Sequence, residues 1–470
     1  MTKAEAMPSY AFAMQDGDFA QALRHVERFA DLDSSDLGEM GVLSFQSMAD
    51  AALLLGREEE AEENYRKAQK LLKGSNDELR IFSCRNTGWL SLSVSRYGAA
   101  LNCFSRITQD AAATREQKIE AIVAIAVIHH RLAQQAAAEE ALAHAARLAA
   151  EAGCDARWGL LIDLLALDFS VQIGVRCAGG LKDHVFWQSA AAYGDHRAKL
   201  ARFTERMGKL PARTPAPEIM AQRYRYLVLL QRCAAGERDV IDALGEQLAL
   251  ARTRECETQT STMQLEIALA ALAGNFSDQA EKLLRGRGAK AQTPSRRWNL
   301  DYMYCQAKIC LKQGNAEEAM KFYAAYSGEA LQCLRSETQV IKSLDGIVET
   351  AVTVPTDDVS ARLPAKYRRA YAYILNNYRS TALTMREVAA HICVTERALQ
   401  LAFKEHLGMS PSAVIRRLRL DAVRTDLLNE RGGGDNIMET ATRLGVKSRS
   451  ALIRGYRKQF NESPSETILR

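Results

Sequence analysis

Two stretches near the C-terminus share one arrangement of basic, amide and apolar side chains. The first reads TERALQLAFKEHL from Thr395, and the second reads SRSALIRGYRKQF from Ser448. Each opens with a hydroxyl residue that can cap a helix. Arginine can donate two hydrogen bonds to guanine and glutamine can pair with adenine, so helices of this kind could read base edges in the major groove of DNA.

The helical period divides each stretch into a buried face and an exposed face. Leu399 and Phe403 are predicted to be buried in the first stretch, and Leu452 and Tyr456 take the same places 53 positions later. The residues predicted to face DNA are Glu396, Arg397, Gln400, Leu401 and Lys404 in the first stretch, and Lys447, Ser448, Arg449, Ser450, Ile453, Arg454, Arg457 and Lys458 in the second. Taken alone, the first face also fits an ordinary solvated helix. The second face is more basic, so we expect it to supply more affinity for phosphates.

A shorter helical segment and a tight turn precede each stretch. The turns are predicted at Cys393 and Gly445, and the resulting helix pairs cover about 384–407 and 436–460. Two helices joined by such a turn have the sequence form of a helix-turn-helix. A Ser-Pro pair opens a long predicted helix over 411–430. This helix fixes the spacing of the two motifs, so both could reach successive major grooves about 34 Å apart.

Residues 365–470 resemble the DNA-binding domain of the AraC/XylS family of bacterial transcription regulators. The matching stretches are LTMREVAAHICVTERALQLAFKEHLGMSPSAVIRRLRLDAV and METATRLGVKSRSALIRGYRKQFNESPSETILR. The resemblance implies seven helices, recognition of double-stranded promoter DNA through both motifs, and RNA polymerase as a partner. Leu401 stands where the family often carries a base-contacting arginine, which its counterpart Arg454 keeps, and Cys393 stands where a smaller turn residue is commoner. The first motif is therefore expected either to read an apolar group such as a thymine methyl or to contribute less to specificity.

The C-terminal quarter is basic, whereas the rest of the chain is mildly acidic. Residues 361–470 hold 20 Lys and Arg against 10 Asp and Glu, and the remaining chain holds 42 against 47. Part of the positive charge lies on the helix predicted over 411–430, where Arg416, Arg417 and Arg419 form basic flanks. A local positive surface of this kind favours a polyanion as partner.

No set of residues for catalysis, metal binding or membrane insertion stands out in the sequence. The 10 cysteines lack paired spacing, and no catalytic or nucleotide-binding motif stands in a convincing context. The longest apolar patch, at about 122–128, is too short to span a bilayer. We therefore expect a cytoplasmic protein with no cofactor, no membrane partner and no enzymatic activity, associated with the nucleoid when it is bound to DNA.

The first 350 residues carry a weak internal repeat. A small turn residue is followed by an apolar residue about five positions on and, in most copies, by another apolar residue four beyond that. The copies are Gly17/Ala22/Val26, Gly56/Ala61/Tyr65, Ser95/Ala100/Phe104, Ala136/Ala141/Ala145, Gly236/Ile241, Gly274/Ala280 and Gly314/Ala319/Tyr323. A fixed period of this size is typical of stacked helical hairpins, and the pattern resembles tetratricopeptide repeats. The predicted fold is all-α: a tetratricopeptide-like solenoid over 1–350 with an insertion near 153–217, a linker at 351–364, and the seven-helix domain at 365–470.

The predicted helical body could receive the signal that regulates the protein. Solenoids of this kind hold a peptide, a partner helix or another protomer, and a plain packed scaffold is the alternative. A helical body before an AraC-type domain is similar to the Hrp-type activators of type III secretion genes in plant-pathogenic bacteria. That similarity implies a virulence-gene activator controlled by a protein or peptide partner or by formation of a homodimer. The alternative function is a tetratricopeptide-type adaptor whose C-terminal domain docks without sequence preference on nucleic acid or protein. The pattern leaves open whether a small molecule binds the body.

Overall fold

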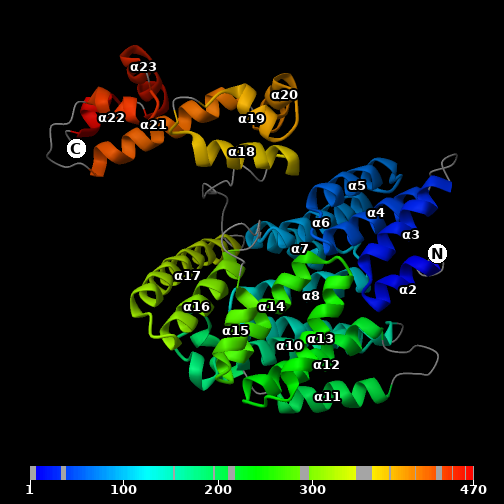
Figure 1. Cartoon of the computed structure of the whole chain (residues 1–470). Helices are drawn as coiled ribbons and strands as arrows, with labels where there is room; N and C mark the ends of the chain where they lie inside the picture. Colours follow the sequence, from blue (N-terminus) through cyan, green and yellow to red (C-terminus); the bar gives the residue numbers. More distant parts are fainter. Residues whose placement is uncertain are drawn as a thin grey trace. The chain divides into compact units, whose positions relative to one another are not determined.

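The chain forms two compact units, Met1–Ala351 and Val352–Arg470 (Figure 1). The computed structural model describes residues 7–32, 39–151, 154–193, 196–209, 217–285, 296–345, 363–380, 383–407, 409–429, 437–446, 448–460 and 462–468. Every regular element within these ranges is a helix, which confirms the predicted all-α class. Apart from Leu363 and Pro364, the predicted linker lies outside the described residues.

Helical hairpins build the first unit. Their helices are α2 (Pro8–Asp16) with α3 (Phe19–Leu32), α4 (Glu39–Leu54) with α5 (Glu58–Leu71), α6 (Asn76–Ser93) with α7 (Tyr97–Gln109), α8 (Arg115–Arg131) with α9 (Gln135–Ala149), α12 (Glu218–Ala234) with α13 (Val240–Thr253), α14 (Glu257–Ala273) with α15 (Ser277–Leu284), and α16 (Arg296–Lys312) with α17 (Ala316–Asp345). Between α9 and α12 lie α10 (Ala156–Arg176), the 3-10 helices η1 (Gly179–Leu181) and η2 (Val185–Tyr193), and α11 (Arg197–Gly208). These four elements fill the region that the sequence predicts as an insertion.

The same turn closes all seven of these hairpins. One residue takes a left-handed conformation, and the amide of the next residue donates to the carbonyl five positions back, as in a Schellman motif. In the second and fourth hairpins, for example, Arg57 N lies 2.9 Å from Ala52 O, and Gln134 N lies 2.9 Å from His129 O. The left-handed residues are Gly17, Gly56, Ser95, Ala133, Gly236, Asn275 and Gly314. Their separations are 39, 39 and 38 residues in the first group and 39 and 39 in the second, so the period is real.

Two of the predicted turn positions are wrong. Ala136 lies inside α9, and the turn is made by Ala133, which places Ala138 rather than Ala141 at the close contact between helices. The sixth turn is made by Asn275 instead of Gly274. Alanine rarely takes a left-handed conformation, so no sequence signal distinguishes Ala133 from Ala136, whereas the glycine beside Asn275 favoured the wrong position.

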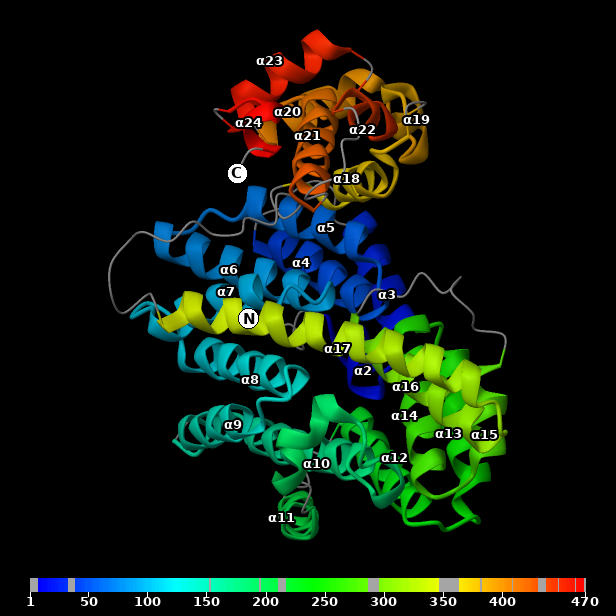
Figure 2. The same cartoon turned by 90° about the vertical axis from the view of Figure 1, so that its left-hand side faces the viewer.

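The solenoid folds back on itself. Arg254, after α13, forms an ion pair of 3.2 Å with Asp16 at the end of α2. A Cβ atom on Gly17 would lie 3.1 Å from Arg254, and one on Gly56 would lie 2.5 Å from the hydroxyl oxygen of Thr258. The first two turns therefore need glycine for the close approach as well as for the backbone angle. At the other end, α17 runs beside α7 (Figure 2).

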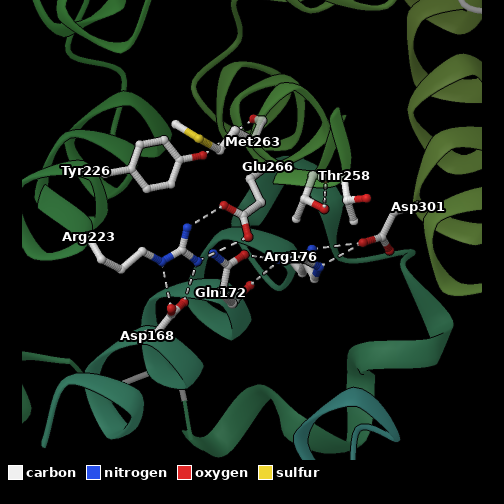
Figure 3. A network of polar contacts seen from close by, with 10 residues as sticks. Asp168, Gln172, Arg176, Arg223, Tyr226, Thr258, Met263, Glu266 and Asp301 are labelled. Atoms are coloured by element: carbon white, nitrogen blue, oxygen red, sulfur yellow. Dashed lines mark hydrogen bonds and ion pairs between the residues drawn. The ribbon is translucent and has the colours of Figure 1, made fainter. Parts of the chain in front are cut away.

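Buried ion pairs join α10 to the helices around it. Arg223 of α12 lies between Asp168 of α10, at 2.7 Å, and Glu266 of α14, at 3.1 Å (Figure 3). Arg176 at the end of α10 pairs with Asp301 of α16 at 2.8 Å. In the described part of the chain, α10 is the one helix long and apolar enough to cross a membrane, and 61% of its apolar window is buried inside the body. A charge at such a position is costly unless it keeps its partner, so these pairs favour the observed packing of the helices.

Seven helices make up the described part of the second unit, as the sequence predicts. They are α18 (Ala365–Asn377), α19 (Met385–His391), α20 (Glu396–Leu407), α21 (Pro411–Asn429), α22 (Ile437–Arg443), α23 (Arg449–Phe460) and α24 (Pro464–Ile468). One apolar core lies under α18 to α20 and a second lies under α22 and α23. The long α21 connects them and contributes residues to both (Figure 1). Tyr378 packs against both cores.

Candidate nucleic-acid interface

The first helix-turn-helix has the caps that its sequence predicts. The hydroxyl of Thr395 accepts the amide of Ala398 at 3.2 Å and so caps α20. Cys393 turns the chain with a φ of +52°, and the amide of Val394 donates to the carbonyl of Ala389 at 3.0 Å. The turn is therefore closed in the same way as the hairpins of the body, although its left-handed residue carries a side chain.

The second helix-turn-helix repeats this construction with glycine at the turn. Gly445 has a φ of +85°, and the amide of Val446 donates to the carbonyl of Ala441 at 2.8 Å. The carbonyl of Ser448 accepts the amide of Leu452 at 2.9 Å, which starts α23 where the sequence predicts it.

The two motifs differ by one residue between the turn and the second helix. The left-handed residues Cys393 and Gly445 are 52 positions apart, whereas the buried residues Leu399 and Leu452 are 53 positions apart. The extra residue of the second turn is Lys447, which lies outside the described residues. The second motif thus carries an additional cation directly before its exposed helix.

The structure describes most of the residues predicted to face DNA, and all of these are exposed. They lie on one face of α20 and on one face of α23, which Ser448 directly precedes. On the first helix they are Glu396, Arg397, Gln400, Leu401 and Lys404, and Leu401 is 65% exposed. On the second they are Ser448, Arg449, Ser450, Ile453, Arg454 and Arg457, and Ile453 is 36% exposed. The side chain of Lys458, like Lys447, lies outside the described residues. Exposed Leu401 and Ile453 are adjacent to the polar groups of each face, so each face combines donors with an apolar surface.

The opposite face of each helix is fixed to its core. Leu399 and Phe403 are fully buried, as predicted. Leu452 and Tyr456 are also buried, with exposed fractions of 2% and 0%. A Cβ atom on Gly455 would lie 2.9 Å from a methyl carbon of Leu420, so glycine lets α23 approach α21 closely. A rigidly packed helix can present its outer side chains in one geometry, which recognition of base edges requires.

Arg419 of α21 connects the segment after α18 with the turn of the second motif. Its guanidinium donates to three backbone carbonyls: Tyr378 O at 2.6 Å, Ser380 O at 2.7 Å and Gly445 O at 2.8 Å. The first two acceptors follow α18, and the third is the turn of the second motif. Burial lowers the pKa of Arg419 below its ordinary value.

The sequence predicts that Arg419, like Arg416 and Arg417, forms a basic flank of this helix. For Arg419 this prediction is wrong. Arg416 and Arg417 are exposed, but Arg419 is half-buried and committed to the backbone. The acceptors lie 26 to 41 residues away along the chain. No local spacing distinguishes one arginine of this run from the next, so the sequence gives no signal for this contact.

Comparison with known proteins connects this geometry with transcription regulators. A helix-turn-helix domain family model matches residues 388–470. The chain is 46% identical over 470 residues to the regulatory protein HrpB of Ralstonia nicotianae, and the match covers 99% of this chain and 97% of that protein. It is 27% identical over 156 residues to a probable thc operon regulatory protein of Rhodococcus erythropolis, covering 33% of this chain and 45% of that protein. It is 25% identical over 104 residues to XylDLEGF operon transcriptional activator 3 of Pseudomonas putida, covering 22% and 31%. No solved structure matches the chain.

Proposed function

Because this chain belongs with the regulatory protein HrpB to the AraC/XylS family of helix-turn-helix DNA-binding transcription regulators, we propose that it activates promoters that it reads through α20 and α23. The observation that supports this most strongly is the pair of helices that are each packed on one face and expose basic and polar side chains on the other. They belong to a domain with a net charge of +10 over residues 361–470. The proposed partners are double-stranded promoter DNA and RNA polymerase.

The two helices have unequal roles in this proposal. On α23, Arg454 reads a base edge, while Arg449 and Arg457 bind phosphates and supply most of the affinity. On α20, Arg397 and Gln400 are the candidates for base contacts. The exposed Leu401 contacts a thymine methyl in place of the hydrogen bond that an arginine would make.

A comparison of Arg454→Ala with Arg457→Ala in the full-length protein tests this division. Loss of Arg454 should cost about 1–3 kcal/mol at the preferred site and relax the preference at one base pair. Loss of Arg457 should weaken binding to all sequences alike and lower the slope of log affinity against log salt by about one. Each variant removes one positive charge from the same helix, so each controls for the other. Unchanged base preference in Arg454→Ala would exclude a reading role for that residue.

Whether the domain prefers any DNA sequence is a separate question with its own test. Gel-shift titration at moderate salt should show tighter binding to a target promoter than to random DNA of equal length. Equal binding would favour the alternative function, an adaptor that docks on nucleic acid without sequence preference.

The helical body is the proposed control domain. Its hairpins offer surfaces for a protein or peptide partner or for a second copy of the chain. Since HrpB is a full-length relative and Hrp-type activators govern type III secretion, secretion and virulence genes in a bacterial cytoplasm are the proposed targets. Genome-wide DNA occupancy and transcript levels, with the full chain and without residues 1–351, would give the targets and the sign of regulation. Targets without secretion genes would exclude this assignment.

A further inference from the structure

A cavity of about 380 Å³ lies in the helical body between α10, α12, α13 and α14. Apolar side chains from all four helices line it, among them Leu164, Met220, Leu250 and Met263. The turn residue Gly17, from the first hairpin, completes the wall. Pockets that hold small molecules typically measure about 300–1,000 Å³ and are mainly apolar, so the size and lining suit such a ligand.

The charged groups of the wall are already paired. Arg223 donates to both oxygens of Asp168, at 2.7 and 2.9 Å, and also contacts Glu266 at 3.1 Å (Figure 3). Arg254 pairs with Asp16 at 3.2 Å and donates to the side-chain oxygen of Gln222 at 2.7 Å. An anionic ligand would have to break one of these pairs, and a cation would meet carboxylates that arginine already occupies. The cavity therefore favours an uncharged ligand.

Neutral polar groups are available in the same wall. Gln247 and Gln259 line the cavity, and an amide side chain both donates and accepts hydrogen bonds. The amide of the third glutamine in the wall, Gln222, already bonds Arg254 and Glu218. A few such groups in an apolar pocket orient a ligand and select it.

The cavity also lies where the first hairpin meets helices from the middle of the body's sequence. Gly17 belongs to the first hairpin, and a Cβ atom on it would lie 3.3 Å from Ile219 of α12. A molecule in the cavity would contact both the first turn and the helices on which it rests. By mass action, a ligand that binds only when the first hairpin rests on α12 stabilises that arrangement.

We propose that this cavity is a binding site for an uncharged, mainly apolar small molecule whose polar end hydrogen-bonds the amides of Gln247 and Gln259. The site belongs to the body, so the proposal stands independently of the DNA-binding function. Its occupant holds the first hairpin against α12 and α13.

The test uses the full-length protein and the fluorescent probe N-phenyl-1-naphthylamine, which is uncharged and apolar. The probe should bind with one site per chain. Leu250→Trp should weaken binding at least tenfold because the larger side chain fills the cavity from its mouth, where Leu250 is 40% exposed. Leu311→Trp is the matched control, since Leu311 is 57% exposed on α16 and is not part of the wall, and it should bind as the unmodified protein does.

Two further measurements separate this site from general surface binding. The sulfonate 1-anilinonaphthalene-8-sulfonate has almost the same ring system with a negative charge, and it should not displace the neutral probe at equal concentration. Hydrogen exchange of residues 7–17 and 217–226 should slow when the neutral probe is bound. Equal binding in Leu250→Trp and unmodified protein, displacement by the sulfonate, or unchanged exchange in these segments would each overturn the proposal. Because no DNA is present, failure here is distinct from failure of the proposed function.

Discussion

Replacement of Arg419 by alanine should loosen the second helix-turn-helix without disturbing the first. From α21, the side chain of Arg419 reaches both the carbonyls after α18 and the turn at Gly445. Its removal leaves α20 packed by Leu399 and Phe403 as before. The turn before α23 loses the donor that fixes it.

The size of the effect follows from the hydrogen bond that the guanidinium donates to Gly445 O, since the other two acceptors follow α18. Such bonds contribute about 1.5–3 kcal/mol each when they are made by a charged group. Arg419 is only half-buried and water can reach the carbonyl that it leaves, so about 1 kcal/mol is expected for local opening of the second motif. Each 1.4 kcal/mol is a factor of ten in an equilibrium, so amide exchange by local opening should rise roughly fivefold in α22 and α23.

Hydrogen–deuterium exchange with mass spectrometry on the full-length protein measures this directly. Peptides from 437–460 should exchange faster in Arg419→Ala, whereas peptides from 385–407 should change little. Arg416→Ala is the matched control because it removes the same charge from an exposed position on the same helix. Binding to target DNA should fall more in Arg419→Ala than in Arg416→Ala, although both lose one positive charge.

Equal exchange in the two variants would refute the assigned role of Arg419. A rise of equal size in 385–407 and 437–460 would also refute it, since the whole domain would then depend on this residue. Arg419→Lys adds a further check. One ammonium group cannot reproduce the planar fork that serves three acceptors, so lysine should restore only part of the protection.

Three other perturbations follow from particular contacts. Leu401→Arg should raise affinity and add a preference for guanine worth about 1–3 kcal/mol at one position, and an unchanged profile in selection from randomised DNA would contradict a base-facing Leu401. Gly17→Ala should lower the free energy of unfolding of the body by about 1–2 kcal/mol because φ is +81° and the added Cβ atom would lie 3.1 Å from Arg254. Ser95→Ala, at a left-handed position that already carries a side chain, should change it by less in denaturant titrations. Burial lowers the pKa of His184 below its ordinary 6.5, so the unfolded chain binds that proton more readily. The contribution of His184 to stability should therefore be complete above about pH 6.5 and be lost as pH falls below it, and His184→Gln should flatten this dependence in urea titrations across that range.

Local patterns in the sequence predicted much of the DNA-binding domain. Thr395 caps α20, Gly445 takes a left-handed conformation, and Leu452 and Tyr456 are buried, all as expected. These features depend on groups within a few residues of one another, where helix geometry fixes which side chains meet. The residues predicted to contact DNA are exposed where described, and their role in binding stays a prediction. In the body the period was correct, but the turn was misplaced from Ala133 to Ala136, because non-glycine residues hold left-handed conformations without a sequence signature.

The sequence by itself thus determined the class of fold, the two helix-turn-helix motifs and the outward faces of their helices, because short-range periodicity and capping decide all three. Only the tertiary structure decided that Arg419 is a backbone clamp rather than a free charge, that Gly17 rests against Arg254, and that a cavity with paired charges lies between α10 and α14. The partners in these contacts lie 26 to 238 residues apart. At such separations the packing of whole helices sets which side chains meet, and no pattern within a turn or two of the chain carries that information.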